Sequence, residues 1–321
     1  MIRIGLVDVD TTHPGFFVPL LHQSPDLRVT ALHDGGAVQT AEYVAGFARE
    51  HGIPQVCDSL DELVASVDAG LVLSQNWDLH LERARPFLEA GKPVFIDKPI
   101  AGRLADLEAL QALAARTGTP VAGGSTMRYA EELVTLREKV AGLGGAVSAW
   151  ASGPGDLLNY GTHILEMVLA FFGPQAEAVT HVGGKRSLLF HLELRDGPPV
   201  LVQFGSGKVM AGNGCVLVVT TGTSVEVVQP PNGWTMRNAA FAALGRFFRE
   251  GVAPAPLADL LQSARVCLAA AEARRTGRRV ALSELPSGAG FDGAAYTRDF
   301  ARLGAWQKDG LDARAVYNVN L

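Results

Sequence analysis

Short apolar runs alternate with segments of helical spacing through the first part of the chain, from Ile2 to about Ala122. This alternation is typical of a parallel sheet whose strands are joined by crossover helices. The pattern predicts strands at residues 2–8, 27–33, 55–57, 69–74, 93–97 and 120–122, and helices at residues 14–23, 37–51, 79–90 and 103–117. Right-handed crossovers bring the carboxyl ends of these strands to one edge, so we expect the loops after residues 8, 33, 74 and 97 to carry function.

The pattern changes after Gly123, where strand-like runs follow one another with few helices between them. Strands are predicted at residues 146–151, 177–183, 187–194, 199–204, 215–220 and 223–228, and helices near residues 131–141, 161–169, 239–250 and 257–276. Such a run of strands indicates a mostly antiparallel sheet. We therefore predict a doubly wound, Rossmann-like α/β domain over residues 1–122, a second α/β domain over 123–284 that the last two helices close, and an irregular tail over 285–321.

Composition and charge narrow the class of protein. The 321 residues are 48% hydrophobic and 19% charged, so the chain can bury a large core. Its net charge is −5, which gives no positive electrostatic potential that would attract nucleic acid or anionic lipid. The first residues lack the features of a secretory signal and no window is long and apolar enough for a membrane span, which predicts a cytoplasmic protein without a membrane partner. Cys57, Cys215 and Cys267 lie far apart and are expected to be buried packing residues.

The predicted strand at 93–97 runs directly into a short charged turn, Asp97-Lys98-Pro99. Proline restricts the residue before it, so the lysine ammonium is directed from the edge of the sheet. A lysine held beside a substrate hydroxyl can orient it and pass its proton, particularly where burial lowers the lysine pKa. The same residues also fit an ordinary surface turn, and the motif alone does not separate the two interpretations.

A second candidate lies in the helix predicted from Gly161. Helical spacing puts Asn159 and His163 on one face and brings Glu166 next to the histidine. An imidazole in this position can take a proton from a hydroxyl near neutral pH. A helix histidine beside a solvated glutamate would give the same pattern, so the chemistry again depends on the surroundings.

Together these segments resemble the glucose-fructose oxidoreductase/inositol dehydrogenase (Gfo/Idh/MocA) family. Residues 97–99 resemble its Glu-Lys-Pro element. The segment around His163 resembles its Asp-x-x-x-His-x-x-Asp helix, with Asn159 and Glu166 at the acidic positions. Other similar segments follow in the family's order, at residues 76–80, 123–129 and 241–280. The resemblance covers nearly all of residues 1–281 and is specific through the order and spacing of its motifs.

The resemblance implies NAD- or NADP-linked oxidation or reduction of a sugar, a cyclitol or a related polyol by hydride transfer. In that scheme His163 removes the hydroxyl proton, Lys98 positions the oxygen, and Asn159 lies where the family has the aspartate that partners the histidine. The first domain would bind the nucleotide, and the sheet of the second would pair subunits into a homo-oligomer. The substrate-binding residues implied are Arg128, Tyr129, Tyr160 and Glu166. The cofactor-binding residues implied outside the first loop are Asp34, Asn76, His80 and Asp97.

The loop after the first strand departs from the family's glycine fingerprint, G-x-G-x-x-G/A. The six matching positions are Asp8, Val9, Asp10, Thr11, Thr12 and His13. Glycine lets the backbone approach a pyrophosphate, whereas a carboxylate about 4 Å from a like charge costs roughly 4 kcal/mol at an effective dielectric of 20. We therefore expect a divergent branch of the family, in which these residues either meet the cofactor in an altered pose or form a different site.

Two alternatives to a dehydrogenase stay open. Asp8, Asp10, His13 and His163 suit a divalent metal, which would give a lyase, hydrolase or isomerase without nicotinamide. The other alternative is a non-catalytic relic that binds a sugar. The presence of both Lys98 and His163 speaks against the relic.

Overall fold

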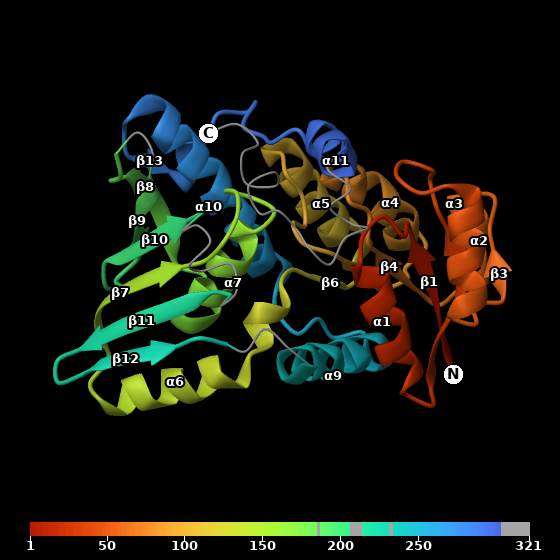
Figure 1. The fold of residues 1–321 in the computed structure, drawn as a ribbon, viewed down its shortest axis with the longest axis horizontal. Helices are drawn as coiled ribbons and strands as arrows, with labels where there is room; N and C mark the ends of the chain where they lie inside the picture. The colour runs from red at the N-terminus through yellow and green to blue at the C-terminus, as the bar shows by residue number, and fades with distance from the viewer. Residues whose placement is uncertain (185–186, 206–213, 231–233, 303–321) are drawn as a thin grey trace.

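The computed structural model describes residues 1–184, 187–205, 214–230 and 234–302. The chain forms two units side by side, each built on one β-sheet, with helices between the two sheets (Figure 1). No helix within the described ranges is long and apolar enough to span a membrane. The three cysteines are free and buried, as predicted.

The first unit is a six-stranded parallel sheet in the order β3-β2-β1-β4-β5-β6. Its strands are β1 Ile2–Val7, β2 Leu27–His33, β3 Gln55–Val56, β4 Ala69–Val72, β5 Val94–Ile96 and β6 Val121–Gly123. Each overlaps a predicted strand, and the doubly wound fold is confirmed. The strand order reverses between β1 and β4, and the crevice at such a reversal is where ligands bind in open α/β sheets.

Five helices join these strands: α1 His13–His22, α2 Ala41–Glu50, α3 Leu60–Ser66, α4 His80–Glu89 and α5 Leu104–Thr117. Four of them match predicted helices, whereas α3 was not predicted. Its seven residues are too few to show a helical repeat, and only Leu63 and Val64 are buried. Ser59 starts the helix by accepting a hydrogen bond from the Glu62 N–H at 3.2 Å.

The second unit is a seven-stranded sheet in the order β12-β11-β7-β10-β9-β8-β13. Its strands are β7 Ala146–Ser152, β8 Ala176–His181, β9 Leu188–Leu194, β10 Val200–Phe204, β11 Val216–Thr221, β12 Val225–Val228 and β13 Val280–Ala281. All pairs are antiparallel except β7 with β10, which confirms a mostly antiparallel sheet. The two-residue β13 is too short for the pattern to predict.

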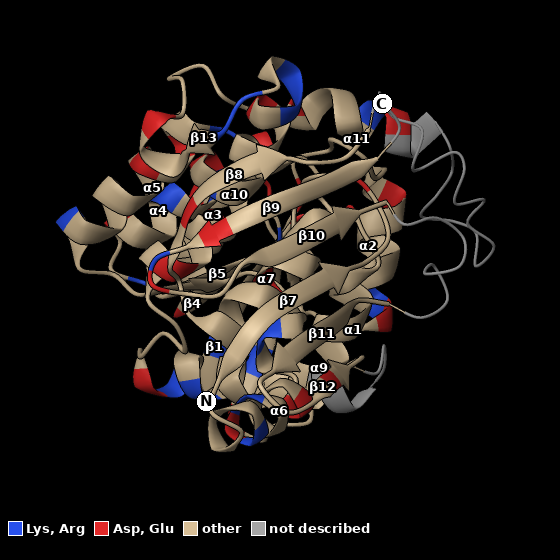
Figure 2. Ribbon diagram, turned by 90° about the vertical axis from the view of Figure 1, so that its left-hand side faces the viewer, with Lys and Arg blue, Asp and Glu red and all other residues tan. Residues whose placement is uncertain are grey.

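The two faces of the second sheet differ. Leu192, Val200, Ala149 and Val219 form a row across the inner face, at most 7% exposed. Helices α7 Gly161–Phe172 and α10 Leu257–Thr276 pack against this face, and α6 Glu131–Gly142 lies beside β12. Among the described residues, no helix lies in front of the outer face, which carries few charged residues (Figure 2).

The last helices do not simply close the second unit, which corrects the prediction for them. Helix α9 Trp234–Glu250 inserts Leu244 and Phe247 into the core of the first unit, where Phe17 also lies. Helix α10 contributes Leu261 to the first unit's core and Val266 to the second's. The division of the chain near residues 122 and 284 therefore stays a prediction, because these helices belong to both cores.

The predicted irregular tail contains a helix, α11 Gly293–Arg302, and residues 303–321 lie outside the described part of the chain. Tyr296 of α11 packs on Trp77, with ring centres 4.8 Å apart. Trp77 belongs to the one-turn helix η1 Trp77–Leu79 after β4. The tail thus returns to the carboxyl edge of the first sheet, which sequence spacing gave no reason to expect.

Candidate active site

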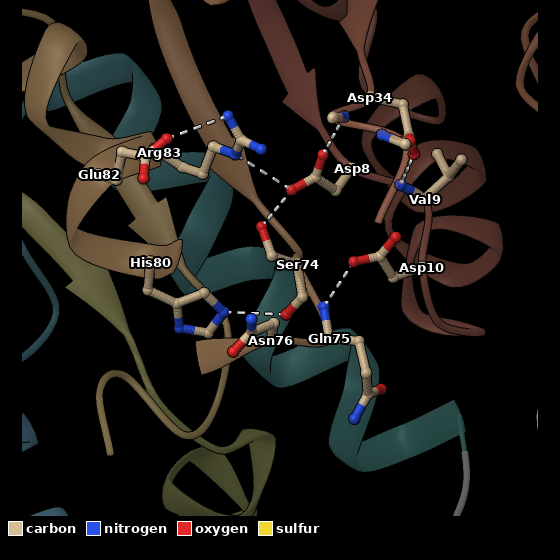
Figure 3. A network of polar contacts seen from close by, with 12 residues as sticks. Asp8, Val9, Asp10, Asp34, Ser74, Gln75, Asn76, His80, Glu82 and Arg83 are labelled. Atoms are coloured by element: carbon tan, nitrogen blue, oxygen red, sulfur yellow. Dashed lines mark hydrogen bonds and ion pairs between the residues drawn. The ribbon is translucent and has the colours of Figure 1, made fainter. Parts of the chain in front are cut away.

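The loop from β1 to α1 keeps the shape of a glycine turn without the glycines. Asp8 has a φ of 63°, in the left-handed region that glycine favours and that aspartate tolerates better than most residues. Its carboxylate accepts hydrogen bonds from the Gly35 N–H at 2.8 Å and from the Ser74 hydroxyl, and Arg83 Nε lies 3.5 Å away (Figure 3). Gly35 and Ser74 lie in the segments that follow β2 and β4, and Arg83 lies in α4, so Asp8 connects three parts of the first unit.

Asp10 reaches across from the same loop to the segment after β4. Its Oδ2 accepts the Gln75 N–H at 2.9 Å, and the side chain is fully buried (Figure 3). Within the described residues, Oδ1 has no hydrogen-bond partner. Burial, and after it the negative charge of Asp8, raises the pKa of Asp10 to about 7.

Asp34, at the end of β2, also bonds within the chain. Its Oδ2 accepts the Val9 N–H at 2.9 Å and its Oδ1 accepts the Gly36 N–H at 2.8 Å. Burial raises its pKa, although these two hydrogen bonds oppose the shift. Thr11 Oγ1 accepts the His13 N–H at 3.1 Å, while Thr12 caps α1 without a side-chain hydrogen bond.

Asn76 and His80, which the resemblance implies as cofactor contacts, instead form hydrogen bonds to the backbone in and around the loop after β4. Asn76 Oδ1 accepts the Asp78 N–H at 3.1 Å and so caps η1. His80 is buried, with Nε2 2.9 Å from the Ser74 carbonyl oxygen and Nδ1 3.3 Å from that of Ile100. Both ring nitrogens of His80 therefore contact the backbone of the chain.

The phosphates of a dinucleotide do not fit this loop in the way that a glycine loop holds them. A glycine loop presents free backbone N–H groups to phosphate. Here the chain's own atoms cover Asp8, Val9 and Asp10, which are at most 1% exposed, and the Val9 N–H is bonded to Asp34. Arg83 pairs with Asp8, and Asp10 has a pKa of about 7. Phosphate binding at residues 8–10 is therefore opposed by the burial of these residues under other parts of the chain, rather than by the expected charge repulsion.

Lys98 reaches from the loop after β5 to the second unit. Its Nζ donates to Asn159 Oδ1 at 2.8 Å and lies 5.6 Å from the centre of the Tyr160 ring. Burial lowers the pKa of Lys98, and the carboxylates of Asp97 and Asp156 oppose that shift. An ammonium held in this way releases its proton more readily than one on the surface.

His163 lies in the first turn of α7 and is bonded to a hydroxyl. Its Nδ1 is 2.6 Å from Ser125 Oγ. Burial lowers the pKa of His163 well below its usual value, and the neighbouring Lys98 and His13 lower it further. Asn159, expected beside the histidine, instead binds Lys98 and donates to the Tyr296 hydroxyl at 2.6 Å.

His13 and Asp97 form a close pair next to these groups. His13 Nδ1 is 2.5 Å from Asp97 Oδ2, and the other oxygen of Asp97 accepts the Lys98 N–H at 2.8 Å. Burial pushes the pKa of Asp97 upward, but its interactions with His13 and Lys98 outweigh that effect and hold the pKa below its usual value. Asp97 is thus a fixed, ionised carboxylate at the carboxyl edge of the first sheet.

The four residues that the resemblance implies as substrate contacts lie in three different surroundings. Tyr160 lies beside Lys98. Glu166 is fully buried, 2.6 Å from Arg128 Nε, and accepts the Ser263 hydroxyl at 2.7 Å, so these charges are directed at each other. Tyr129 lines an apolar cavity with Phe17, Phe95, Phe241 and Leu244, and burial raises its pKa to about 12.

The four residues considered for a metal do not form a metal centre. Asp8 contacts Ser74 and Gly35, Asp10 contacts Gln75, and His13 contacts Asp97. Across the described ranges, no three or more His, Cys, Asp or Glu side chains lie together so that they could hold a metal ion.

Sequence reasoning missed several residues that hold this site together. Their partners are distant in sequence: Arg83 pairs with Asp8 and Tyr296 bonds to Asn159. Asp156 accepts the Leu158 and Asn159 N–H groups at 2.8 and 2.6 Å, which resembles an Asx turn and is a signal that the sequence does offer. The other residues missed are Ser74, Gln75 and Ser125, which no local pattern distinguishes.

Comparison with known proteins adds information on ancestry. Residues 3–125 match the Gfo/Idh/MocA family model, described as an oxidoreductase family with an NAD-binding Rossmann fold. The chain is 27% identical to a proposed UDP-kanosamine synthase oxidoreductase subunit of Amycolatopsis mediterranei (strain S699), over 54% of this chain and 53% of that protein. It is 32% identical to an inositol 2-dehydrogenase of Gluconacetobacter diazotrophicus, over 34% of this chain and 32% of that protein. The chain thus spans about half or less of the length of the curated relatives it matches.

The fold is shared over most of its length with solved structures. One is scyllo-inositol dehydrogenase from Lactobacillus casei with bound NAD(H) and scyllo-inositol, with a TM-score of 0.72 over 88% of this chain and 99% of that one. At 15% identity this likeness concerns the fold alone. The first unit of this chain is therefore similar to the NAD-binding Rossmann domain of the Gfo/Idh/MocA oxidoreductase family, and the likeness in fold extends over most of the chain.

Proposed function

We propose that this chain is an oxidoreductase of a sugar, a cyclitol or a related polyol, and that Lys98 and His163 meet the hydroxyl of the reacting carbon. The observation that carries the proposal is that these two side chains, one from each unit, are both buried and lie close enough for Lys98 to act on the pKa of His163. Burial lowers the pKa of Lys98, so the lysine releases its proton more readily than one in water, and burial lowers the pKa of His163 well below its usual value, which favours the neutral imidazole. The inositol 2-dehydrogenase among the relatives supports this substrate class.

The two groups differ in what they can do to a hydroxyl. Lys98 Nζ donates to the Asn159 side-chain oxygen at 2.8 Å and to the Asn159 carbonyl oxygen at 3.4 Å, and a third N–H of the ammonium would donate to the substrate oxygen and orient it. His163 is neutral near pH 7, because its pKa lies well below the usual value. With its Nδ1 engaged by Ser125, its Nε2 is the atom available to a ligand. Tyr160, whose ring faces the Lys98 ammonium, would form one wall of the pocket.

NAD or NADP is the proposed hydride acceptor, since this is the family's cofactor and would supply the two-electron chemistry. The covered loop at residues 8–10 does not fit the cofactor's phosphates, and we derive no step through it. The same observation favours a second candidate, a non-redox proton transfer on the same substrates. Isomerisation or elimination needs acid and base groups but no hydride acceptor.

One experiment separates the two candidates. The protein is incubated in D₂O with myo-inositol, scyllo-inositol, glucose or xylose, with and without NAD⁺ or NADP⁺. Absorbance reports reduced nicotinamide, and NMR of the sugar reports deuterium entering carbon. Nicotinamide reduction that disappears in Lys98→Met supports the oxidoreductase. Deuterium uptake without cofactor supports the non-redox candidate. If the wild-type protein shows neither nicotinamide reduction nor deuterium uptake, both candidate functions are refuted.

We also propose that the outer face of the second sheet pairs two copies of this chain. His191, Leu201, Trp150, Val218 and Val227 lie side by side in one row across this face. Leu201 is 37% exposed and Val227 is 61% exposed. A mostly apolar row of this kind, on a sheet face that no described helix covers, is a typical protein–protein contact. Light scattering after size exclusion tests it, because elution of only a 33.9 kDa species would refute the pairing.

A further inference from the structure

Two histidines reach the proposed site, and they differ in what holds them. His163 Nδ1 faces the hydroxyl of Ser125 at 2.6 Å, whereas His13 Nδ1 faces the carboxylate of Asp97 at 2.5 Å. An imidazole that accepts a proton becomes a cation, which a carboxylate stabilises and a hydroxyl does not. The carboxylate-paired histidine of this chain is therefore His13, on the first helix, rather than the motif histidine on α7.

The His13–Asp97 pair is rigidly placed. His13 is the first residue of α1 and is followed by Pro14, and its backbone N–H is bonded to Thr11 Oγ1 at 3.1 Å. Its ring lies 6.3 Å from that of Phe17, one turn further along the helix. Asp97 is held in turn by the Lys98 N–H. A base whose orientation is fixed by an ionised partner is the arrangement that activates a hydroxyl in catalytic triads.

The pair also lies at the reacting end of the site. Asp97 directly precedes Lys98, and the charges of Lys98, His13 and Asp97 all act on the pKa of His163. The His13 side chain is 31% exposed while that of Asp97 is only 7% exposed. The imidazole thus bridges a buried carboxylate and an accessible surface, as a group that passes protons to water must.

We propose that His13, oriented by Asp97, is a further catalytic residue that takes the proton released by the substrate. The proposal rests on the function proposed above. With Nδ1–H donated to Asp97, Nε2 is the acceptor: the substrate O–H bond breaks, an N–H bond forms on Nε2, and Asp97 balances the imidazolium charge. Lys98 and His163 hold the oxygen during this transfer, and the exposed edge of His13 returns the proton to water.

The test compares His13→Gln and Asp97→Asn with wild type and with a matched control, His51→Gln, which changes a histidine outside the site. Glutamine keeps a side-chain hydrogen-bond donor but cannot accept the proton. We expect kcat for the turned-over sugar to fall about 100-fold or more in His13→Gln with little change in KM, as for loss of a general base. The decrease in rate on the acid side of the wild-type pH–rate profile should be absent in His13→Gln. Turnover by His13→Gln within threefold of wild type, with that decrease retained, would overturn the proposal.

A second measurement needs no substrate. Long-range ¹H–¹⁵N spectra of histidine-labelled protein report which ring nitrogen of His13 carries the proton. We expect the Nδ1–H form at neutral pH, and its loss in Asp97→Asn. The Nε2–H form in wild type would overturn the proposal whatever the kinetics show. Wild-type protein that shows the Nδ1–H form but turns over no sugar would instead count against the proposed function.

Discussion

The buried carboxyl of Asp10 makes stability depend on pH in a direction opposite to that of most carboxylates. Its pKa is raised from 3.8 to about 7 by burial and by Asp8. In the unfolded chain the carboxyl ionises near pH 4, while in the folded chain it stays protonated up to about pH 7. The stabilisation is therefore fully present below the unfolded pKa and is lost as the pH rises through the folded one.

The size of this effect follows from the shift. One pKa unit corresponds to about 1.4 kcal/mol, so the full shift amounts to about 4 kcal/mol, of which roughly 2.5 kcal/mol falls between pH 5 and pH 8. Asp10→Asn removes the ionisation and leaves an oxygen for the Gln75 N–H. Its buried amide NH₂ adds a penalty of about 1–3 kcal/mol, but that penalty is independent of pH. The free energy of unfolding of Asp10→Asn minus that of wild type should thus rise by roughly 2–3 kcal/mol from pH 5 to pH 8.

Urea unfolding followed by circular dichroism at the two pH values measures this difference. The matched control is Asp61→Asn, an exposed carboxyl in the first turn of α3, for which we expect a change below about 1 kcal/mol. If the difference between Asp10→Asn and wild type is the same at pH 5 and pH 8, Asp10 does not titrate near neutrality. The loop would then carry a full negative charge, and repulsion of phosphate would again explain its chemistry.

Three other changes test separate parts of the structure. Arg83→Met leaves the buried carboxylate of Asp8 without its cation and should lower the free energy of unfolding by about 3 kcal/mol in urea titrations; a loss under 1 kcal/mol would contradict the pairing. Asn159→Asp puts a carboxylate where the amide oxygen lies 2.8 Å from Lys98 Nζ. That charge should raise the pKa of Lys98 and move the corresponding limb of the pH–rate profile up by about one unit or more, and an unmoved limb would separate Lys98 from the titration. Trp150→Arg adds a charge to the outer sheet face and should give monomers by light scattering at concentrations where wild type is dimeric.

Much of the fold could be predicted because its strands are buried runs of apolar residues. Parallel strands covered on both faces read as continuous hydrophobic segments, and the strands of the second sheet alternate. Prediction failed where an element was too short or lay in a polar segment. Helix α3 has seven residues, and α11 lies in the segment expected to be irregular. Tyr296 of α11 packs on Trp77, a contact across more than 200 residues of sequence that no local pattern predicts.

The candidate site was predictable to the extent that it lies on loops at the carboxyl edge of the sheet. Lys98 and the residues after β1 follow from that rule, whereas His163 was predicted from the helical spacing around it and from the family resemblance. Their partners were not, because partnership depends on packing across large separations in sequence. Asn159 matches the position of a histidine partner, yet its amide binds Lys98 from the other unit and Tyr296 from the tail. Helical spacing places residues on a face but says nothing about what that face meets.

Compared with a glycine loop, the loop after β1 differs in two ways: Asp8 and Asp10 remove space for a phosphate, and His13 adds an acid–base group. Asp8 and Asp10 take up the backbone and side-chain partners around them and so close the space over the loop. Three residues later, His13 adds a carboxylate-paired imidazole to the place where Lys98 and His163 meet. The segment that binds phosphate in a glycine loop thus supplies an acid–base group here. If the hydride acceptor is bound, it must be held mainly by contacts outside residues 8–10; if it is not, three nitrogen bases remain, which is enough for proton transfer alone.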